Sequence, residues 1–353
     1  MAEPIPAHVV TGPLGSGKTT AIGRLLAAKP PGQNWVVLLN EFSEAGIDTL
    51  TVASAARGAF DVRLVPGGCL CCAGEQDFRR NLHELVTVTR PDRILIEPSG
   101  LGHPGGVVDE LLGHEAQGRL RLAGIVALVD PRRLREGGLP PGSEALAQVE
   151  IADSLALSKA DLATDADLAR FEALAASLFP AKAWSGPLVA GLIPSEALEP
   201  AHLVARAAPQ ARPHGHERPS SGLLPAPDEG GLAVANGVRR EVRRLGHRAL
   251  SWVFPRSVEF SRRRLEGLLA AAGTEDAAAS PSGAEGRAAP IARLKGVFRV
   301  GEDDWVLAQA GDRFLDLRPT SWRRDSRVEL LVGGSEPFEA GDWDAGWLQC
   351  QRR

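Results

Sequence analysis

A glycine-rich loop between an apolar run and a helical stretch constrains the fold of this chain most. Residues 12–19 read GPLGSGKT and match the pattern GxxxxGK(S/T) of a phosphate-binding loop. The apolar run His8–Thr11 precedes the loop, and Thr19–Ala28, with helical spacing, follows it. Glycines let backbone N–H groups converge on phosphate oxygens at a helix N-terminus, where the helix dipole favours negative charge. The sequence therefore predicts a strand, a phosphate-binding loop and a helix in this order.

The side chains of this loop have distinct expected roles. Lys18 reaches the outer phosphates of a nucleotide, and the Thr19 hydroxyl ligates Mg²⁺. Further nucleotide contacts are expected from the other residues of the loop, namely Gly12, Gly15, Ser16, Gly17 and Thr20.

A second motif is an apolar run that ends in an acid. Ile94–Ile96 is followed by Glu97, and Gly100 comes three residues later. The pattern predicts a strand whose carboxylate meets the magnesium site, a position that is usually Asp in such NTPases. Gly100 would let its backbone approach the γ-phosphate. Acids at strand ends are common, so this interpretation depends on the preceding loop; with it, Lys18 and Glu97 are the candidate catalytic residues.

The stretch LSKADL at residues 157–162 resembles the guanine-recognition loop NKxD of GTPases. The Asp161 carboxylate can accept hydrogen bonds from the guanine N1–H and 2-amino groups, which adenine does not offer together. The aliphatic part of Lys159 can lie over the base. Ser158 stands where Asn is usual and keeps only a hydroxyl. The alternative is a helix start, with Ser158 or Asp161 as the N-cap.

Three of the four cysteines, Cys69, Cys71 and Cys72, lie within four residues. Such thiolates can bind one soft or borderline metal ion, and the spacing differs from the paired CxxC motifs of a closed structural zinc site. The alternatives are a redox pair or small buried side chains.

An acidic segment follows the apolar run Trp35–Leu39. Its carboxylates, Glu41, Glu44 and Asp48, could ligate Mg²⁺ or a transported metal. The alternative is a solvated loop.

Apolar runs alternate with helical stretches over the first 200 residues, which predicts an α/β fold with a mostly parallel sheet. The expected strands include Trp35–Leu39, Ile94–Ile96, Ile125–Val129 and Ser154–Leu157, and the expected helices include Gln76–Val88 and Asp165–Ser177. We assign residues 1–205 to a P-loop GTPase domain.

The composition changes after this domain. Residues 206–246 are rich in Pro, Gly and Arg and are assigned to a linker. Residues 247–353 are assigned to a smaller α+β domain with a low-complexity loop at 274–289. Its expected elements are a strand at Ala249–Phe254, a helix at Ser261–Ala272 and short strands at Ile291–Val300, Asp304–Ala310, Arg313–Leu317 and Arg327–Val332.

Charge and hydropathy exclude two classes of partner. Lys and Arg total 40 against 44 Asp and Glu, a net charge of -4, so the basic footprint of a nucleic-acid-binding protein is absent. No segment approaches about 18 uninterrupted apolar residues, and the N-terminus lacks a signal-peptide pattern. We therefore expect a cytoplasmic protein with neither nucleic-acid nor membrane partners.

Taken together, the motifs GxxGSGKTT, NEFxExGID, GGCxCC, ExSG and SKAD, in this order, resemble the CobW-like family of metal-handling P-loop GTPases, related to HypB and UreG. The resemblance continues into the C-terminal region, at LSWVF (250–254) and LKGVF (294–298). Ser43, where Gly is usual, and Ser158 depart from the family pattern.

The resemblance implies a GTP-hydrolysing metallochaperone with GTP and Mg²⁺, and with Zn²⁺ (or Co²⁺) bound by the three cysteines and the nearby Glu41 and Glu44. It also implies a client metalloprotein that receives the metal, and a homodimer. The alternatives are a cobalt-handling factor in cobalamin synthesis and a metalloenzyme activator such as a nitrile hydratase activator.

Overall fold

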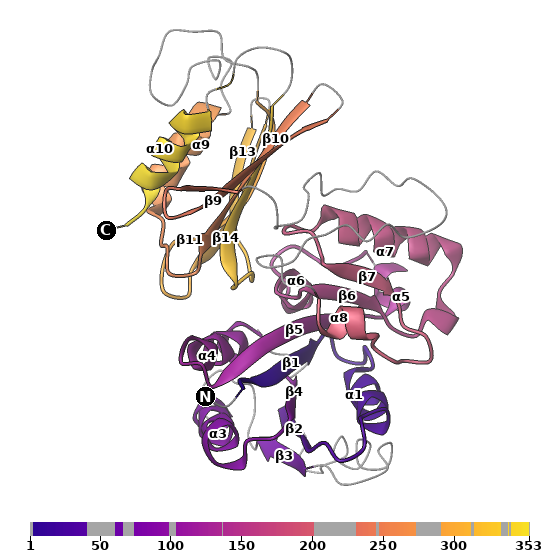
Figure 1. The fold of residues 1–353 in the computed structure, drawn as a ribbon. Coiled ribbons are helices and arrows are strands. Elements are labelled where there is room, and N and C mark those ends of the chain that lie inside the picture. Colours follow the sequence, from indigo (N-terminus) through magenta and orange to yellow (C-terminus); the bar gives the residue numbers. More distant parts are fainter. Residues whose placement is uncertain are drawn as a thin grey trace. The chain divides into compact units, whose positions relative to one another are not determined.

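The computed structural model describes residues 3–40, 61–65, 74–98, 104–135, 137–200, 231–244, 247–272, 291–311, 314–332, 338 and 340–352. The chain divides into two compact units (Figure 1). The first unit comprises Met1–Leu178 and Lys182–Pro200, and the second comprises Phe179–Ala181 and Ala201–Arg353. No helix in the described ranges has both the length and the apolar character that a membrane span requires.

In the described residues, the first unit contains a sheet of seven strands, and every neighbouring pair is parallel. In spatial order the strands are β3 (Asp61–Val65), β2 (Trp35–Asn40), β4 (Arg93–Glu97), β1 (Ile5–Thr11), β5 (Leu120–Val129), β6 (Ser154–Leu157) and β7 (Trp184–Pro187). Because all strands run the same way, their carboxyl ends share one edge, where open α/β sheets bind ligands. The predicted α/β class is confirmed.

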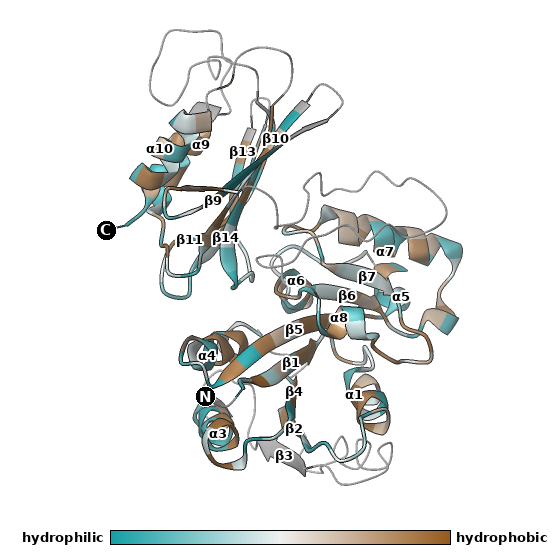
Figure 2. Cartoon of the chain, viewed as in Figure 1, coloured by the Kyte–Doolittle hydropathy of each residue, from teal (hydrophilic) through white to brown (hydrophobic). Residues whose placement is uncertain are grey.

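Helices cover both faces of this sheet, so its central strands are buried on both sides. The apolar runs of β1 and β5 follow from this, and Figure 2 shows both strands as largely hydrophobic. On one face, α3, α4, α6 and α7 pack their apolar side chains against residues such as Val9 and Ile96. On the other face, α1 and α8 pack against residues such as Val10 and Leu95.

The helical elements in the described ranges of the first unit connect these strands. They are α1 (Lys18–Ala27), α3 (Gly74–Glu84), the π-helical turn η1 (Leu85–Thr89), α4 (Gly105–Ala116), α5 (Pro131–Arg135), α6 (Glu144–Glu150), the 3-10 turn η2 (Ala160–Leu162), α7 (Asp165–Ser177) and α8 (Ser195–Leu198).

Where the structure describes it, the second unit is an antiparallel sheet with two helices, which confirms the predicted α+β class of the C-terminal region. In spatial order its strands are β13 (Phe314–Pro319), β12 (Trp305–Gly311), β11 (Ile291–Arg299), β14 (Asp325–Val332), β10 (His247–Pro255), β9 (Gly237–Arg244) and β8 (Leu232–Val234). The helices α9 (Arg262–Ala272) and α10 (Ala340–Cys350) pack on one face of the sheet, where Trp252 contacts Trp347 edge to face.

The predicted linker over 206–246 differs from the structure in its last part. Residues 232–244 form β8 and β9, and β9 pairs along most of its length with β10. The turn between them has positive φ at Ala235 and Asn236, as tight hairpin turns require. The sequence of β9 is rich in Arg and was therefore assigned to the linker, but backbone pairing with β10 stabilises it as a strand. Residues 201–230 and the predicted loop at 274–289 lie outside the described residues.

Candidate functional site: a nucleotide site at the carboxyl edge of the parallel sheet

The loop between β1 and α1 has the backbone of an anion site. Gly12, Gly15 and Gly17 have φ values of 137°, 78° and 88°, which glycine adopts without strain. A Cβ at Gly12 would lie 2.3 Å from the carbonyl oxygen of Leu128, so this position has no room for a side chain. Gly17 precedes α1 and supplies no side-chain cap. The first N–H groups of α1 therefore remain available to an anion at the loop.

Lys18 and Ser16 add polar atoms inside this loop. The Lys18 side chain is buried, and its Nζ donates to the backbone carbonyl oxygens of Gly12 at 3.0 Å and Pro13 at 3.3 Å. The ammonium thus lies over the loop. The Ser16 Oγ is buried without a hydrogen-bond partner in the described part of the chain. Thr20 is exposed in the first turn of α1. A charge and an unsatisfied hydroxyl at a helix N-terminus suit phosphate oxygens.

Thr19 and Glu97 meet across two elements. The Thr19 Oγ1 donates to the Glu97 carboxylate, at 3.1 Å from Oε1 and 3.2 Å from Oε2. Glu97 is the last residue of β4 and is 8% exposed. A hydroxyl and a carboxylate are oxygen ligands of the kind that Mg²⁺ prefers. The structure brings these two predicted residues together, whereas Gly100 and Asp48 lie outside the described residues.

The predicted base loop follows β6 at the same sheet edge. The Ser158 Oγ is buried and donates to the Val129 carbonyl oxygen at 3.2 Å. Lys159 has a positive φ of 49°, and its Nζ donates to the carbonyl oxygen of Gly15 at 2.6 Å. Asp161 is exposed in η2. The base loop therefore contacts the phosphate-binding loop, although the two are far apart in sequence.

The alternative of a helix start at Ser158 or Asp161 is wrong. Helix α7 begins at Asp165, and Thr164 is its N-cap in a capping box with Asp167. The Asp161 side chain is thus not used to cap α7.

Sequence reasoning missed Asp130, which follows β5 and holds Lys159, the residue that joins the base loop to the phosphate-binding loop. Its buried carboxylate accepts from Lys159 Nζ at 2.9 Å and from Arg132 Nη2 at 2.7 Å. These hydrogen bonds, led by that of Arg132, hold the pKa of Asp130 well below its usual range. Asp130 also accepts from the backbone N–H of Arg132 and so caps α5. The run IVALVD, with an acid after an apolar strand, was the signal available in the sequence.

The predicted metal ligands lie outside the described residues: Cys69, Cys71, Cys72, Glu41 and Glu44. Among the residues that are described, no group of three or more His, Cys, Asp or Glu side chains could hold a metal ion. Cys350 lies buried in α10, and burial raises the pKa of its thiol to about 11.

Fold and site together define a P-loop protein that binds a nucleotide at the carboxyl edge of a parallel sheet. A family model described as the CobW/HypB/UreG nucleotide-binding domain matches residues 6–185. The chain belongs to this family of P-loop GTPases.

Relatives span different shares of the chain. The zinc chaperone YeiR of Escherichia coli (strain K12) is 30% identical over 346 residues, which are 96% of this chain and 94% of YeiR. The zinc chaperone YjiA of the same organism is 31% identical over 171 residues, 47% of this chain and 52% of YjiA. The crystal structure of Zn(II)-bound YjiA GTPase covers 99% of this chain and 100% of its own, at 18% identity and a TM-score of 0.42.

Proposed function

We propose that this GTPase is a metallochaperone that couples its nucleotide state to the binding and transfer of zinc. The observation that carries the proposal is a likeness to the zinc chaperone YeiR along 96% of the chain. The nucleotide site described above supplies the GTP-dependent part, and the cysteine cluster of the sequence supplies ligands that zinc prefers.

In this proposal each part of the sheet edge contacts one part of GTP. Gly12 and residues 15–20 hold the phosphates, with Gly100 near the γ-phosphate, and Lys18 balances their charge. Thr19, Glu97 and Asp48 would hold Mg²⁺, which offsets charge on the phosphates when bound; the Thr19–Glu97 pair fits its preference for oxygen. Ser158, Lys159 and Asp161 recognise the base.

The sheet topology supports a zinc site near this nucleotide site. Strand β2 lies beside β4, with Leu39 in register with Glu97, and β3 lies on the other side of β2. The segment with Glu41 and Glu44 begins directly after β2, and Cys69 comes four residues after β3. Four residues span at most about 14 Å, so the chain keeps Cys69 within this distance of the end of β3, at the sheet edge that also carries Glu97.

The proposal extends to the partners and the compartment. Zinc passes to a client metalloprotein, and the GTPase acts as a homodimer in the cytoplasm, where reducing conditions leave the thiolates free to bind metal.

Replacing the cysteine cluster tests the zinc site. We expect the triple variant Cys69→Ser, Cys71→Ser, Cys72→Ser to lose high-affinity zinc, because a serine hydroxyl stays protonated near neutral pH and ligates poorly. Competition with a chromogenic chelator measures zinc affinity, and calorimetry measures GDP affinity, which should change less than about twofold. The wild type should bind one zinc per chain, with lower affinity at lower pH because protons compete for the thiolates.

Cys350→Ser is the matched control. Its buried thiol has a pKa of about 11 and stays protonated, so this variant should bind zinc as the wild type does. Zinc uptake by the triple variant at wild-type affinity would place the site elsewhere.

A further inference from the structure

Helix α5 has three arginines whose side chains reach different parts of the nucleotide site. Arg132 binds Asp130, which binds Lys159 of the base loop. Arg133 Nη2 donates to the carbonyl oxygen of Leu14, in the phosphate-binding loop, at 3.1 Å. Arg135 reaches the other end of the base loop. One short helix therefore contacts both loops through side chains.

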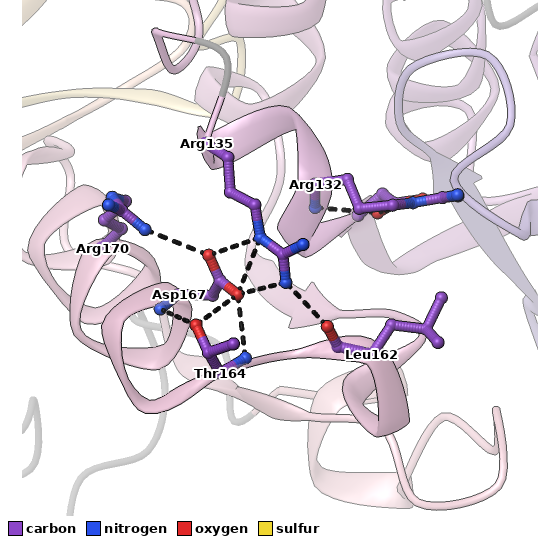
Figure 3. A network of polar contacts seen from close by, with 7 residues as sticks. Arg132, Arg135, Leu162, Thr164, Asp167 and Arg170 are labelled. Carbon is purple, nitrogen blue, oxygen red and sulfur yellow. Dashed lines mark hydrogen bonds and ion pairs between the residues drawn. The ribbon is translucent and has the colours of Figure 1, made fainter.

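Arg135 holds the backbone beside Asp161. Its Nη2 donates to the carbonyl oxygen of Leu162 at 2.8 Å, and Leu162 directly follows Asp161 (Figure 3). Its Nε and Nη2 also donate to the Asp167 carboxylate, at 3.0 Å and 2.5 Å. A guanidinium with two anchoring bonds to a carboxylate has a fixed plane, so its third bond fixes the place of the Leu162 carbonyl.

Asp167 makes this anchor rigid. Its side chain is fully buried and also accepts from the backbone N–H of Thr164 at 2.8 Å and from Arg170 Nη1 at 3.1 Å. The hydrogen bonds of Arg135, above all, hold the pKa of Asp167 well below its usual range, so the carboxylate stays charged. Asp167 belongs to α7, whose packing on the sheet through Phe171 fixes its position.

The opposite end of the base loop is held in the same manner. Lys159 lies between the Asp130 carboxylate and the Gly15 carbonyl oxygen. Residues 159–162 are thus fixed at Lys159 through Arg132 and at Leu162 through Arg135. Only Asp161, between these two points, presents an exposed carboxylate.

We propose that Arg135 is a positioning residue for base recognition, which places the Asp161 carboxylate where it can accept both hydrogen bonds of a purine with a 2-amino group. The inference rests on the proposed role of Asp161 and names what sets its geometry. Arg135 does not touch the nucleotide; it acts through the Leu162 carbonyl.

The test compares GDP with IDP, which lacks the 2-amino group, by calorimetry on the full chain. In the wild type, GDP should bind more tightly than IDP. In Arg135→Gln we expect the ratio of the IDP and GDP dissociation constants to fall at least about fivefold toward one, because a displaced carboxylate gains little from the second donor. The ADP dissociation constant, which reports on the phosphate site, should stay within about twofold.

Arg170→Gln is the matched control. Arg170 pairs with the same carboxylate of Asp167 but has no bond to the base loop among the described residues, so the ratio should remain as in the wild type. If Arg135→Gln does not fold, Arg135→Lys is the second variant. Its ammonium keeps a charge beside Asp167 but cannot also contact the Leu162 carbonyl, so it should lower the ratio similarly.

Two results would overturn the inference. One is an unchanged ratio in a folded Arg135 variant; the other is an equal fall in Arg170→Gln, which would indicate a general loss of structure. Asp161→Ala separates this failure from that of the proposed function. If the wild-type ratio is near one and Asp161→Ala leaves it there, base recognition by Asp161 is itself wrong, and the inference is wrong with it.

Discussion

At the scale of single residues, the surroundings of Gly12 and Gly15 differ although both lie in the phosphate-binding loop. Both have positive φ values. A Cβ at Gly12 would meet the Leu128 backbone at 2.3 Å, whereas a Cβ at Gly15 would meet nothing within 4 Å. The motif alone treats the two glycines alike, and only the packing of the loop against β5 separates them.

This difference predicts unequal costs of two identical substitutions. Gly12→Ala should lower the free energy of unfolding by about 3 kcal/mol or more, because it adds a backbone collision to an unfavourable φ. Gly15→Ala should lower it by about 1 kcal/mol, the cost of a left-handed φ alone. Urea unfolding of both variants measures the difference. Equal losses would contradict the close approach of Gly12 to Leu128.

The residues of the site divide by whether a local sequence motif contains them. The sequence predicted Lys18, Thr19 and Glu97 because each belongs to a local motif, and the structure places Thr19 against Glu97. It did not predict Arg135, which belongs to no such motif and pairs with Asp167 of another helix. An ion pair between two helices depends on how they pack, and no local spacing encodes it.

At the scale of elements, β1 contains a buried histidine that links three segments. The His8 ring is fully buried; its Nδ1 donates to the Leu198 carbonyl oxygen at 3.1 Å and its Nε2 accepts from Arg93 of β4 at 2.7 Å. This arrangement fits the neutral ring. Burial first, and the positive charges of Arg93 and Arg121, lower the pKa of His8 to about 3.

The lowered pKa predicts acid destabilisation of the first unit. Below pH 6.5 the histidine of the unfolded chain binds a proton that the histidine of the folded protein does not bind until about pH 3. The free energy of unfolding therefore decreases as the pH is lowered through this window. Between pH 7 and pH 4 this amounts to about 3 kcal/mol. The Gln side chain of His8→Gln stays neutral and can still donate and accept hydrogen bonds. Between pH 7 and pH 4 the free energy of unfolding of this variant should therefore fall by about 3 kcal/mol less than that of the wild type.

Urea unfolding at both pH values measures this effect. His83→Gln is the control, because His83 is exposed on α3 and meets water in either state. The same pH dependence in His8→Gln as in the wild type would show that His8 titrates normally in the folded protein.

Elements were predictable where their own residues carry the signal. Helix α7 has the predicted bounds, Asp165–Ser177, because the sequence TDAD contains its capping box. The central strands were found from their apolar runs. The edge strand β7, with the sequence WSGP, has neither an apolar run nor alternation, and it forms by pairing with β6. β9 was missed for the same reason, since β10 supplies its hydrogen bonds.

At the scale of the whole molecule, a chaperone that works by GTP hydrolysis needs two ligands that influence each other. In the proposed function the phosphates and zinc occupy one sheet edge, through segments that follow β1, β2, β3 and β4. A ligand shifts an equilibrium only by its differential affinity for the two states. Loss of the γ-phosphate can therefore release zinc only if zinc affinity differs between the GTP-bound and GDP-bound states.

Thermodynamic linkage makes the last prediction two-sided. Zinc should bind at least about tenfold more tightly with Mg²⁺ and a non-hydrolysable GTP analogue than with Mg²⁺ and GDP, a coupling of about 1.4 kcal/mol. Zinc must then favour the GTP analogue over GDP by the same factor. Chelator competition measures the ratio of the zinc affinities in the two nucleotide states, and calorimetry measures the ratio of the affinities for the GTP analogue and GDP with and without zinc. The triple cysteine variant is the control, in which zinc should no longer change this nucleotide ratio. Equal zinc affinity in both nucleotide states would leave a GTPase that binds zinc without controlling its release.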